Sequence, residues 1–91
     1  MTSQTISYVA KAEPAEEGGY IVKFPDLSGC ITEAESLGEA RIMAKDAMTA
    51  YLISLKKDEM PFPQAKHQLR NNLQGAQQFI VSAELSDLVQ K

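Results

Sequence analysis

The stretch Gly18–Cys30, GGYIVKFPDLSGC, decides how the rest of the chain folds. Apolar and polar side chains alternate over Tyr20–Phe24, and this period of two predicts a half-buried strand. Pro25 ends that strand because a proline nitrogen has no hydrogen to donate to a sheet. The next residues, Pro25–Gly29, favour turns, so we expect the chain to reverse direction here.

Further strands are predicted on both sides of this stretch. Thr5–Ala12 alternates in the same way, and the polar segment 13–19, which ends in a glycine pair, predicts a hairpin connection to the strand that follows. After the turn, Cys30–Ala34 is short and favours β-structure. Three strands with short links predict an antiparallel meander.

A long helix is predicted next. Ser36 and Glu39 have the spacing of a capping box, in which each side chain accepts a hydrogen bond from a free amide of the first turn. The helix should run from Leu37 to about Lys56 and stop before Met60–Pro63. Apolar residues recur every three or four positions and define the face that packs on the sheet, namely Leu37, Ala40, Ala44, Ala47, Met48, Tyr51, Leu52 and Leu55.

The last predicted element is a fourth strand. Segment 64–78 is polar, with a short helical turn considered around 65–73. Phe79–Leu85 begins with three large apolar residues, which favours burial on both faces and a position away from the sheet edge. Because a helix precedes it, we expect this strand to lie parallel to a meander strand through a right-handed crossover. The predicted class is α+β, in the order β-β-β-α-β, with one long helix packed on one sheet.

Length and charge restrict the function. The chain has 91 residues, 44% hydrophobic and 23% charged, which predicts one domain covering residues 1–91. Its net charge is −3 at pH 7, whereas nucleic-acid-binding domains are usually basic. Residues 1–40 hold seven acidic and two basic side chains, and this asymmetry favours a basic partner.

Cysteine and histidine are too few for several kinds of site. Cys30 and His67 are the only residues of their types, so neither an internal disulfide nor a Cys/His zinc site can form. No run of about 18 apolar residues is present to span a membrane. Met1–Ile6 lacks the features of a signal peptide. We therefore expect a cytoplasmic protein with no metal and no cofactor.

The opening stretch also resembles a family signature. Gly18–Cys30 is similar to the GGY-v-v-x-F-P-D-L-x-G-C pattern of HicB-like antitoxins, which belong to type II toxin–antitoxin systems. The likeness covers about residues 5–64 and continues through Ile31-Thr32, Ser36-Leu37, Glu39-Ala40, Pro61 and Pro63. The resemblance implies a partial RNase H-like fold and a protein that binds a HicA-like, RNA-cleaving toxin and blocks its activity.

Three features depart from the family pattern. Ala34-Glu35 stands where the family usually has glycine before an acidic residue, and a left-handed backbone there would be strained for alanine. Gly38 replaces an acidic residue of the first helical turn. The chain stops at Lys91, where many members continue into a DNA-binding domain, so we expect a short form with no direct DNA binding.

The candidate residues divide into a partner-binding set and a structural set. For the 25–29 loop, two interpretations stay open: its residues form a turn, or they contact a partner. As turn residues, Asp26 would cap the turn through its own side chain and Gly29 would supply an unusual φ. The residues expected to contact a partner are Tyr20, Phe24, Asp26, Leu27, Glu33 and Glu35, with Glu16 and Glu17 as further acidic contacts. Structural roles are expected for Gly19, Pro25, Gly29, Cys30, Ser36 and Glu39.

Two alternatives to toxin neutralisation are weighed. One is an orphan homo-oligomeric domain of the same fold with no toxin partner. In either case we predict a homodimer or a larger assembly, because one helix cannot cover the apolar area of Ile31, Phe79, Ile80 and Val81.

The other alternative is an enzyme, and we expect no catalytic residue. A metal-dependent nuclease would draw on Asp26, Glu33, Glu35, Glu39 and Glu84, but the first strand has no acidic residue between Ile6 and Lys11. Cys30 as a nucleophile with His67 as its base is disfavoured, because a small buried residue is expected where the third strand starts.

Overall fold

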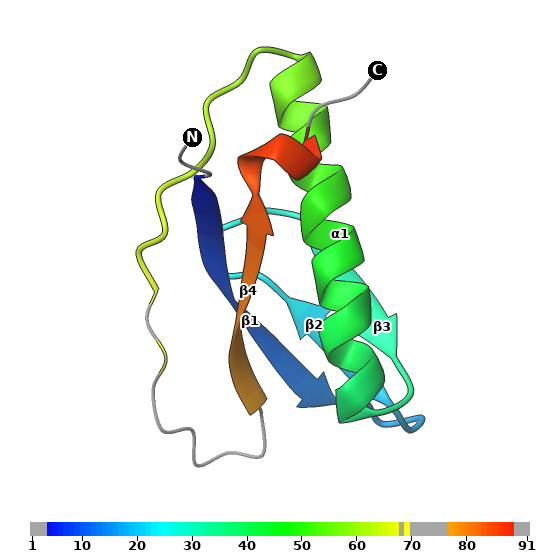
Figure 1. Ribbon diagram of the computed structural model, residues 1–91. Coiled ribbons are helices and arrows are strands. Elements are labelled where there is room, and N and C mark those ends of the chain that lie inside the picture. The colour runs from blue at the N-terminus through cyan, green and yellow to red at the C-terminus, as the bar shows by residue number, and fades with distance from the viewer. Residues whose placement is uncertain (1–3, 68, 70–76, 89–91) are drawn as a thin grey trace.

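Figure 1 shows the computed structural model, which describes residues 4–67, 69 and 77–88. The described residues form β1 (Thr5–Pro14), β2 (Tyr20–Lys23), β3 (Ile31–Ala34), α1 (Leu37–Lys57), β4 (Gln77–Glu84) and the 3-10 helix η1 (Leu85–Leu88). This order confirms the predicted β-β-β-α-β arrangement and the α+β class. Among these elements, no helix has the length and hydropathy needed to cross a lipid bilayer. Most of the helical turn considered around 65–73 lies outside the described residues, and 65–67 are not helical.

The three N-terminal strands form the expected antiparallel meander. Residues 11–14 of β1 pair with 20–23 of β2, and 20–23 pair with 31–34 of β3. β1 is much longer than its neighbour, and its residues 5–12 pair with β4 on the other side. The sheet order is therefore β3-β2-β1-β4.

The predictions for β4 are wrong in two respects. β4 pairs antiparallel with β1 and does not pair parallel with a meander strand through a right-handed crossover, because residues 58–67 first run back along the sheet after α1 ends (Figure 1). β4 therefore runs in the same direction as β2, but β1 lies between them. β4 is also an edge strand. Phe79 and Val81 are buried on the face that α1 covers, whereas Ile80 between them is 53% exposed on the opposite face. The run Phe79–Val81 is therefore buried on one face only, because α1 packs against one side of β4.

The core lies between α1 and the sheet. The buried residues of α1 recur every fourth position, as Ala40, Ala44, Met48 and Leu52. Leu37, the first residue of the predicted stripe, is 37% exposed. The alanines let the helix lie close to the sheet, and burial of each larger side chain, such as Leu52, stabilises the fold by roughly 1.5–3 kcal/mol.

The N-terminus of α1 confirms the capping box in a shifted form. Ser36 Oγ accepts a hydrogen bond from the N–H of Glu39 at 3.0 Å. The carboxylate of Glu39 accepts one from the N–H of Glu35 at 3.1 Å, one residue before the cap, where a standard box would use the amide of Ser36.

The C-terminus of α1 is closed by a Schellman motif before the proline-rich segment begins. The N–H of Met60 donates to the carbonyl of Leu55 at 2.8 Å, and the N–H of Glu59 donates to the carbonyl of Lys56 at 3.1 Å. Glu59 has φ +56°, a left-handed conformation that more often belongs to glycine.

A close backbone approach between β2 and β3 depends on Gly19. Its φ is +75°, and a Cβ at this position would lie 2.6 Å from the carbonyl oxygen of Ala34. Among the described non-glycine residues, Glu59 alone has a positive φ, so Ala34 and Glu35 adopt an ordinary backbone without strain. The family glycine that is absent at Ala34 is therefore not needed here, while Gly19 is.

We predict that Gly19→Ala destabilises the fold more than Gly29→Ala. Gly29 also has a positive φ, +81°, but a Cβ there would meet nothing within 4 Å. Gly29→Ala should therefore cost only the left-handed strain, about 1–2 kcal/mol, and Gly19→Ala should cost at least about 1 kcal/mol more, since backbone must shift. Urea denaturation of both variants measures the difference, and equal losses would contradict the close approach.

Candidate functional site

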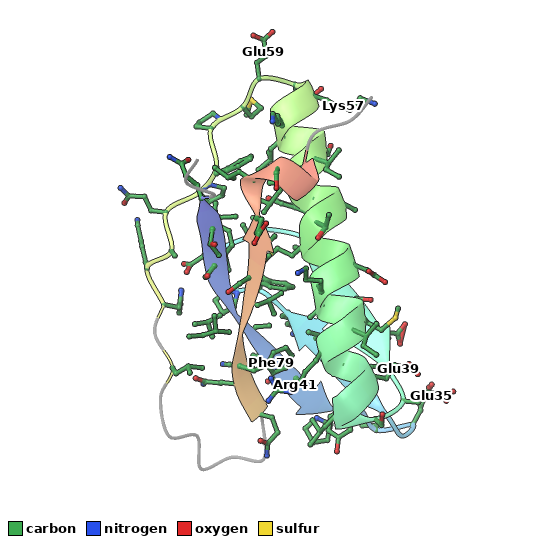
Figure 2. All side chains as sticks on the ribbon, viewed as in Figure 1. Glu35, Glu39, Arg41, Lys57, Glu59 and Phe79 are labelled. Atoms are coloured by element: carbon green, nitrogen blue, oxygen red, sulfur yellow. The ribbon has the colours of Figure 1, made fainter. Side chains whose placement is uncertain are left out.

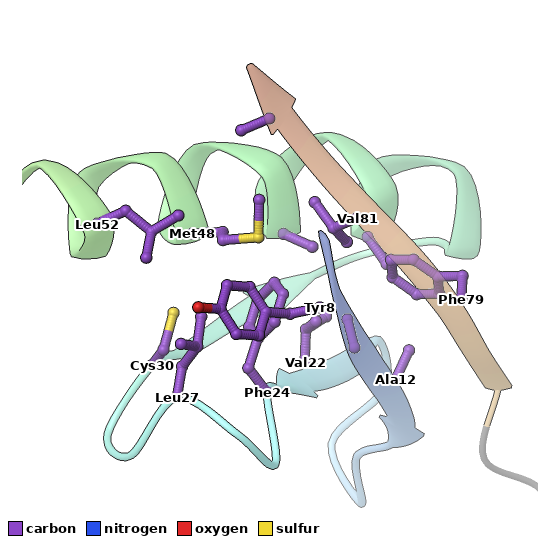
Figure 3. Close-up of a cluster of buried hydrophobic side chains, with 14 of the residues drawn as sticks. Tyr8, Ala12, Val22, Phe24, Leu27, Cys30, Met48, Leu52, Phe79 and Val81 are labelled. Atoms are coloured by element: carbon purple, nitrogen blue, oxygen red, sulfur yellow. The ribbon is translucent and has the colours of Figure 1, made fainter. Parts of the chain in front are cut away.

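The PDLSG loop, Pro25–Gly29, is built from two consecutive turns. The N–H of Leu27 donates to the carbonyl of Phe24, and the N–H of Cys30 donates to the carbonyl of Leu27, both at 3.0 Å. Gly29 is the third residue of the second turn, and its φ of +81° is the value that a type II turn requires. Phe24 and Leu27 insert into the core, as Figure 3 shows, so apolar contacts anchor the loop.

Asp26 connects this loop to the segment that follows α1. Its Oδ2 accepts hydrogen bonds from the N–H groups of Lys66 and His67, both at 2.9 Å, and its Oδ1 lies 2.6 Å from Nδ1 of His67. An ionised carboxylate can only accept, so Nδ1 carries the proton in this contact. We call these three bonds the Asp26 clamp. The prediction that Asp26 caps its own turn is wrong, because both of its oxygens bind residues about forty positions away.

Two tyrosine hydroxyls join the same region to the strand and the helix. Tyr8 of β1 donates to the carbonyl of Pro63 at 2.6 Å, and Tyr51 of α1 donates to the carbonyl of Ser28 at 2.9 Å. The loop, the helix, the strand and the post-helix segment are therefore linked at one place by side-chain hydrogen bonds.

The post-helix segment, residues 58–67, lies on the face of the sheet opposite to α1 (Figure 1). A cleft of about 210 Å³ lies between it and the outer face, lined by Ser7, Tyr8, Val9, Ala65, His67, Leu69 and Ile80. Val9 faces this cleft and is buried, so the segment covers part of the outer face. The clamp thus determines which apolar residues of the outer face solvent can reach.

Burial and the clamp shift the pKa of Asp26 in opposite directions. Burial of this side chain, which is 6% exposed, by itself would raise the pKa, yet the hydrogen bonds and the nearby charge of His67, together with the N–H of Lys66, lower it below its ordinary value. The pKa of Tyr8 is raised, first by burial and then by the negative charge of Asp26. Asp26 is therefore ionised near neutral pH, and Tyr8 keeps the proton that it donates to Pro63.

The six residues expected to contact a partner lie in different environments. Phe24 and Leu27 are core residues, so they shape the loop but present no side chain to a partner. Asp26 is occupied by the clamp. Tyr20 is half-buried and packs against the core. Glu33 and Glu35 are exposed.

Glu33 and Glu35 line an acidic hollow next to the start of α1. The hollow has a volume of about 480 Å³ and is lined by Glu17, Gly18, Gly19, Glu33, Ala34, Glu35 and Glu39. Figure 2 shows Glu35 and Glu39 close together at this end of α1, with Lys57 and Glu59 at the other end. The exposed carboxylates of the acidic hollow are suited to meet cationic side chains. Glu16 is exposed in the adjacent hairpin connection.

The chemistry of the remaining candidates is structural. Cys30 is buried in the core, and burial raises the pKa of its thiol, which disfavours the reactive thiolate. His67 is held by the clamp and is half-exposed. Within the part of the chain that the structure describes, no three residues among His, Cys, Asp and Glu are arranged to hold a metal ion.

Sequence reasoning did not identify the partners that make up this site. The helix pattern places Tyr51 on an apolar face, and nothing in the sequence indicates that the hydroxyls of Tyr8 and Tyr51 donate to the carbonyls of Pro63 and Ser28. His67 was weighed only as a catalytic base. An ionised carboxylate that is removed from solvent needs hydrogen-bond donors. The presence of both Asp26 and His67 in the sequence is therefore the signal from which the clamp could have been predicted.

We predict that Asp26→Asn destabilises the fold by about 2–3 kcal/mol. An amide cannot replace a carboxylate that accepts from three donors, and hydrogen bonds to a charged group contribute about 1.5–3 kcal/mol each. His67→Ala keeps the backbone N–H groups of residues 66 and 67 as donors to Asp26, so it should lower the free energy of unfolding by less. Urea denaturation measures both, with the exposed Asp46→Asn as the matched control. A loss for Asp26→Asn no larger than that control would contradict the clamp.

The clamp should also weaken in acid. The pKa of Asp26 is lowered in the folded chain, so its contribution is complete above the unfolded pKa of about 4 and is lost as the pH falls through the lower folded value. The difference in unfolding free energy between the wild type and Asp26→Asn should therefore shrink from pH 6 to pH 3. A difference that is constant over this range in urea titrations would show that ionisation of Asp26 does not stabilise the fold.

Comparison with known sequences identifies relatives among antitoxins. The chain is 39% identical over 62 residues to antitoxin HicB 1 of Photorhabdus laumondii, an alignment that covers 66% of this chain and 40% of the relative. It is 40% identical over 58 residues to antitoxin HicB of Escherichia coli K12, covering 62% and 42%. The chain thus spans about two fifths of the length of these two curated relatives.

Solved structures of low sequence identity share the fold. A chain from a toxin–antitoxin complex of Streptococcus pneumoniae superposes with a TM-score of 0.76 at 16% identity, covering 96% of this chain and 74% of that one. A chain from a complex of HicA3 and HicB3 gives a TM-score of 0.66 at 18% identity, covering 84% and 95%. The sequence model of the family described as "HicB_like antitoxin of bacterial toxin-antitoxin system" matches residues 8–91, and the chain belongs to this family.

Proposed function

We propose that the chain is a cytoplasmic antitoxin that neutralises a HicA-type, RNA-cleaving toxin by direct protein–protein contact. The observation that carries the proposal is the family match over residues 8–91. The names of its relatives support it, since two of them are HicB antitoxins and one related structure contains HicA3 with HicB3. The proposed mechanism is occlusion: the antitoxin covers the surface with which the toxin binds RNA, and no covalent step is involved.

We place the toxin-binding surface at the acidic hollow. A protein that binds RNA phosphates presents lysine and arginine side chains, and these are complementary to Glu17, Glu33 and Glu35. Tyr20 is half-buried and supplies an aromatic side chain of the kind enriched in interfaces. The PDLSG loop does not form this surface, because it joins β2 and β3 at the other end of the pair and its Phe24 and Leu27 are buried.

The direct test is a titration of the purified chain into an RNA-cleavage assay of the toxin encoded next to it. Cleavage should fall in proportion to added antitoxin and stop near equal molar amounts. Full cleavage in the presence of excess folded antitoxin would refute the proposal.

We predict that reversing the charge of the acidic hollow slows association with the toxin. The variant Glu17→Lys, Glu33→Lys, Glu35→Lys should lower the association rate at least about tenfold at low ionic strength, because steering by complementary charge raises association rates by about 10–1,000-fold. The effect should diminish with added salt. Surface plasmon resonance at two salt concentrations measures both.

The matched control changes the same number of exposed charges elsewhere, as Asp46→Lys, Glu59→Lys and Glu84→Lys. Both triple variants have the same net charge, so a general charge effect would slow them equally. An equal loss in the two variants would place the toxin-binding surface elsewhere.

A further inference from the structure

The sheet ends in two edges of different character. The β3 edge is four residues long, contains Glu33 and adjoins the acidic hollow. The β4 edge is eight residues long, and its sequence QQFIVSAE has no charged residue before Glu84. Natural proteins protect edge strands by shortness, charge or proline. β3 is short and carries a charged residue. Residues 77–83 of β4 form a longer stretch that contains neither a charged residue nor a proline.

Ile80 lies at the centre of this unprotected edge strand. It is 53% exposed on the outer face, while its neighbours Phe79 and Val81 are buried under α1. Figure 2 shows Arg41 beside Phe79, and the guanidinium lies 4.7 Å from the ring centre. The inner face of β4 is therefore covered, and its exposed apolar area is on the outer face at the edge itself.

We propose that β4 is the strand through which two copies of this chain pair, antiparallel and edge to edge, with the two-fold axis at Ile80. In this register Ile80 lies opposite Ile80 of the second copy. Gln78 lies opposite Ser82 on the same outer face, and Phe79 lies opposite Val81 on the inner face. Over residues 78–82 polar residues thus meet polar ones and apolar residues meet apolar ones, and no like charges are opposed.

Self-pairing fits this edge better than strand addition by a basic toxin. A two-fold interface must be self-complementary, and β4 meets that condition over residues 78–82. A basic partner finds no carboxylate there before Glu84, whereas the acidic hollow is at the opposite edge of the sheet. The paired form is one continuous sheet of eight strands, with both hollows at its outer ends. This inference is independent of the proposed toxin binding.

The first experiment measures the oligomeric state of the full chain by light scattering at about 50 µM, a concentration that reveals weak dimers. The wild type should be a dimer and Ile80→Lys a monomer. The controls are Ile31→Lys on the β3 edge and Ile42→Lys on the free face of α1, both exposed positions that should stay dimeric. A monomeric wild type, or a dimeric Ile80→Lys, would overturn the proposal.

A second experiment tests the register without a disruptive charge. Directly opposed residues of antiparallel strands have Cα atoms about 4.5 or 5.5 Å apart, and both values lie in the range of disulfides. Ile80→Cys should therefore form a covalent dimer under mild oxidation, while Ile42→Cys should not. Cys30 is buried, so wild type should stay uncrosslinked. Failure of Ile80→Cys to crosslink above the Ile42→Cys level would overturn this register.

The experiments distinguish failure of the proposed toxin binding from failure of the proposed pairing through β4. A monomeric Ile80→Lys that still stops RNA cleavage supports both. Loss of inhibition by Ile80→Lys, with a monomeric wild type, would show that the toxin and not a second copy occupies β4.

Discussion

The carboxylate of Asp26 holds together parts of the chain that the sheet leaves separate. Residues 60–67 have no regular secondary structure, so their backbone N–H groups need acceptors from elsewhere. Asp26 supplies two such acceptor contacts, and Tyr8 binds the carbonyl of Pro63 from the other side. These bonds hold residues 63–67 across the outer face, where the chain runs back along the sheet before β4.

This dependence explains how far the sequence predicts the fold. The meander and α1 follow from local patterns: alternation in the strands, a capping box, and an apolar repeat that ends at the prolines. The direction and position of β4 do not follow from any local pattern. A parallel crossover is the ordinary expectation for a strand after a helix, but here residues 58–67 first run back along the sheet, held by a contact about forty residues apart in sequence.

The candidate site was predicted in part for a similar reason. The PDLSG stretch was correctly located as a turn, but its sequence does not separate residues that build the loop from residues that the loop presents. Two consecutive turns direct Phe24 and Leu27 inward and Asp26 toward His67. The exposure of Glu33, on β3, and of Glu35, just after it, follows more directly from the sequence, because a charged side chain stays in solvent unless it is paired.

The clamp also limits which surfaces remain for partners. By holding the post-helix segment over Val9, it covers part of the outer face, and α1 covers the inner face. The two edges are accessible as well, and the sheet order places the acidic β3 edge and the neutral β4 edge as far apart as four strands allow. One edge has the charge to attract a basic protein and the other has a sequence that complements itself. In the two proposals above, the toxin and a second copy of the chain bind at opposite edges of the same sheet, so they would not compete for one surface.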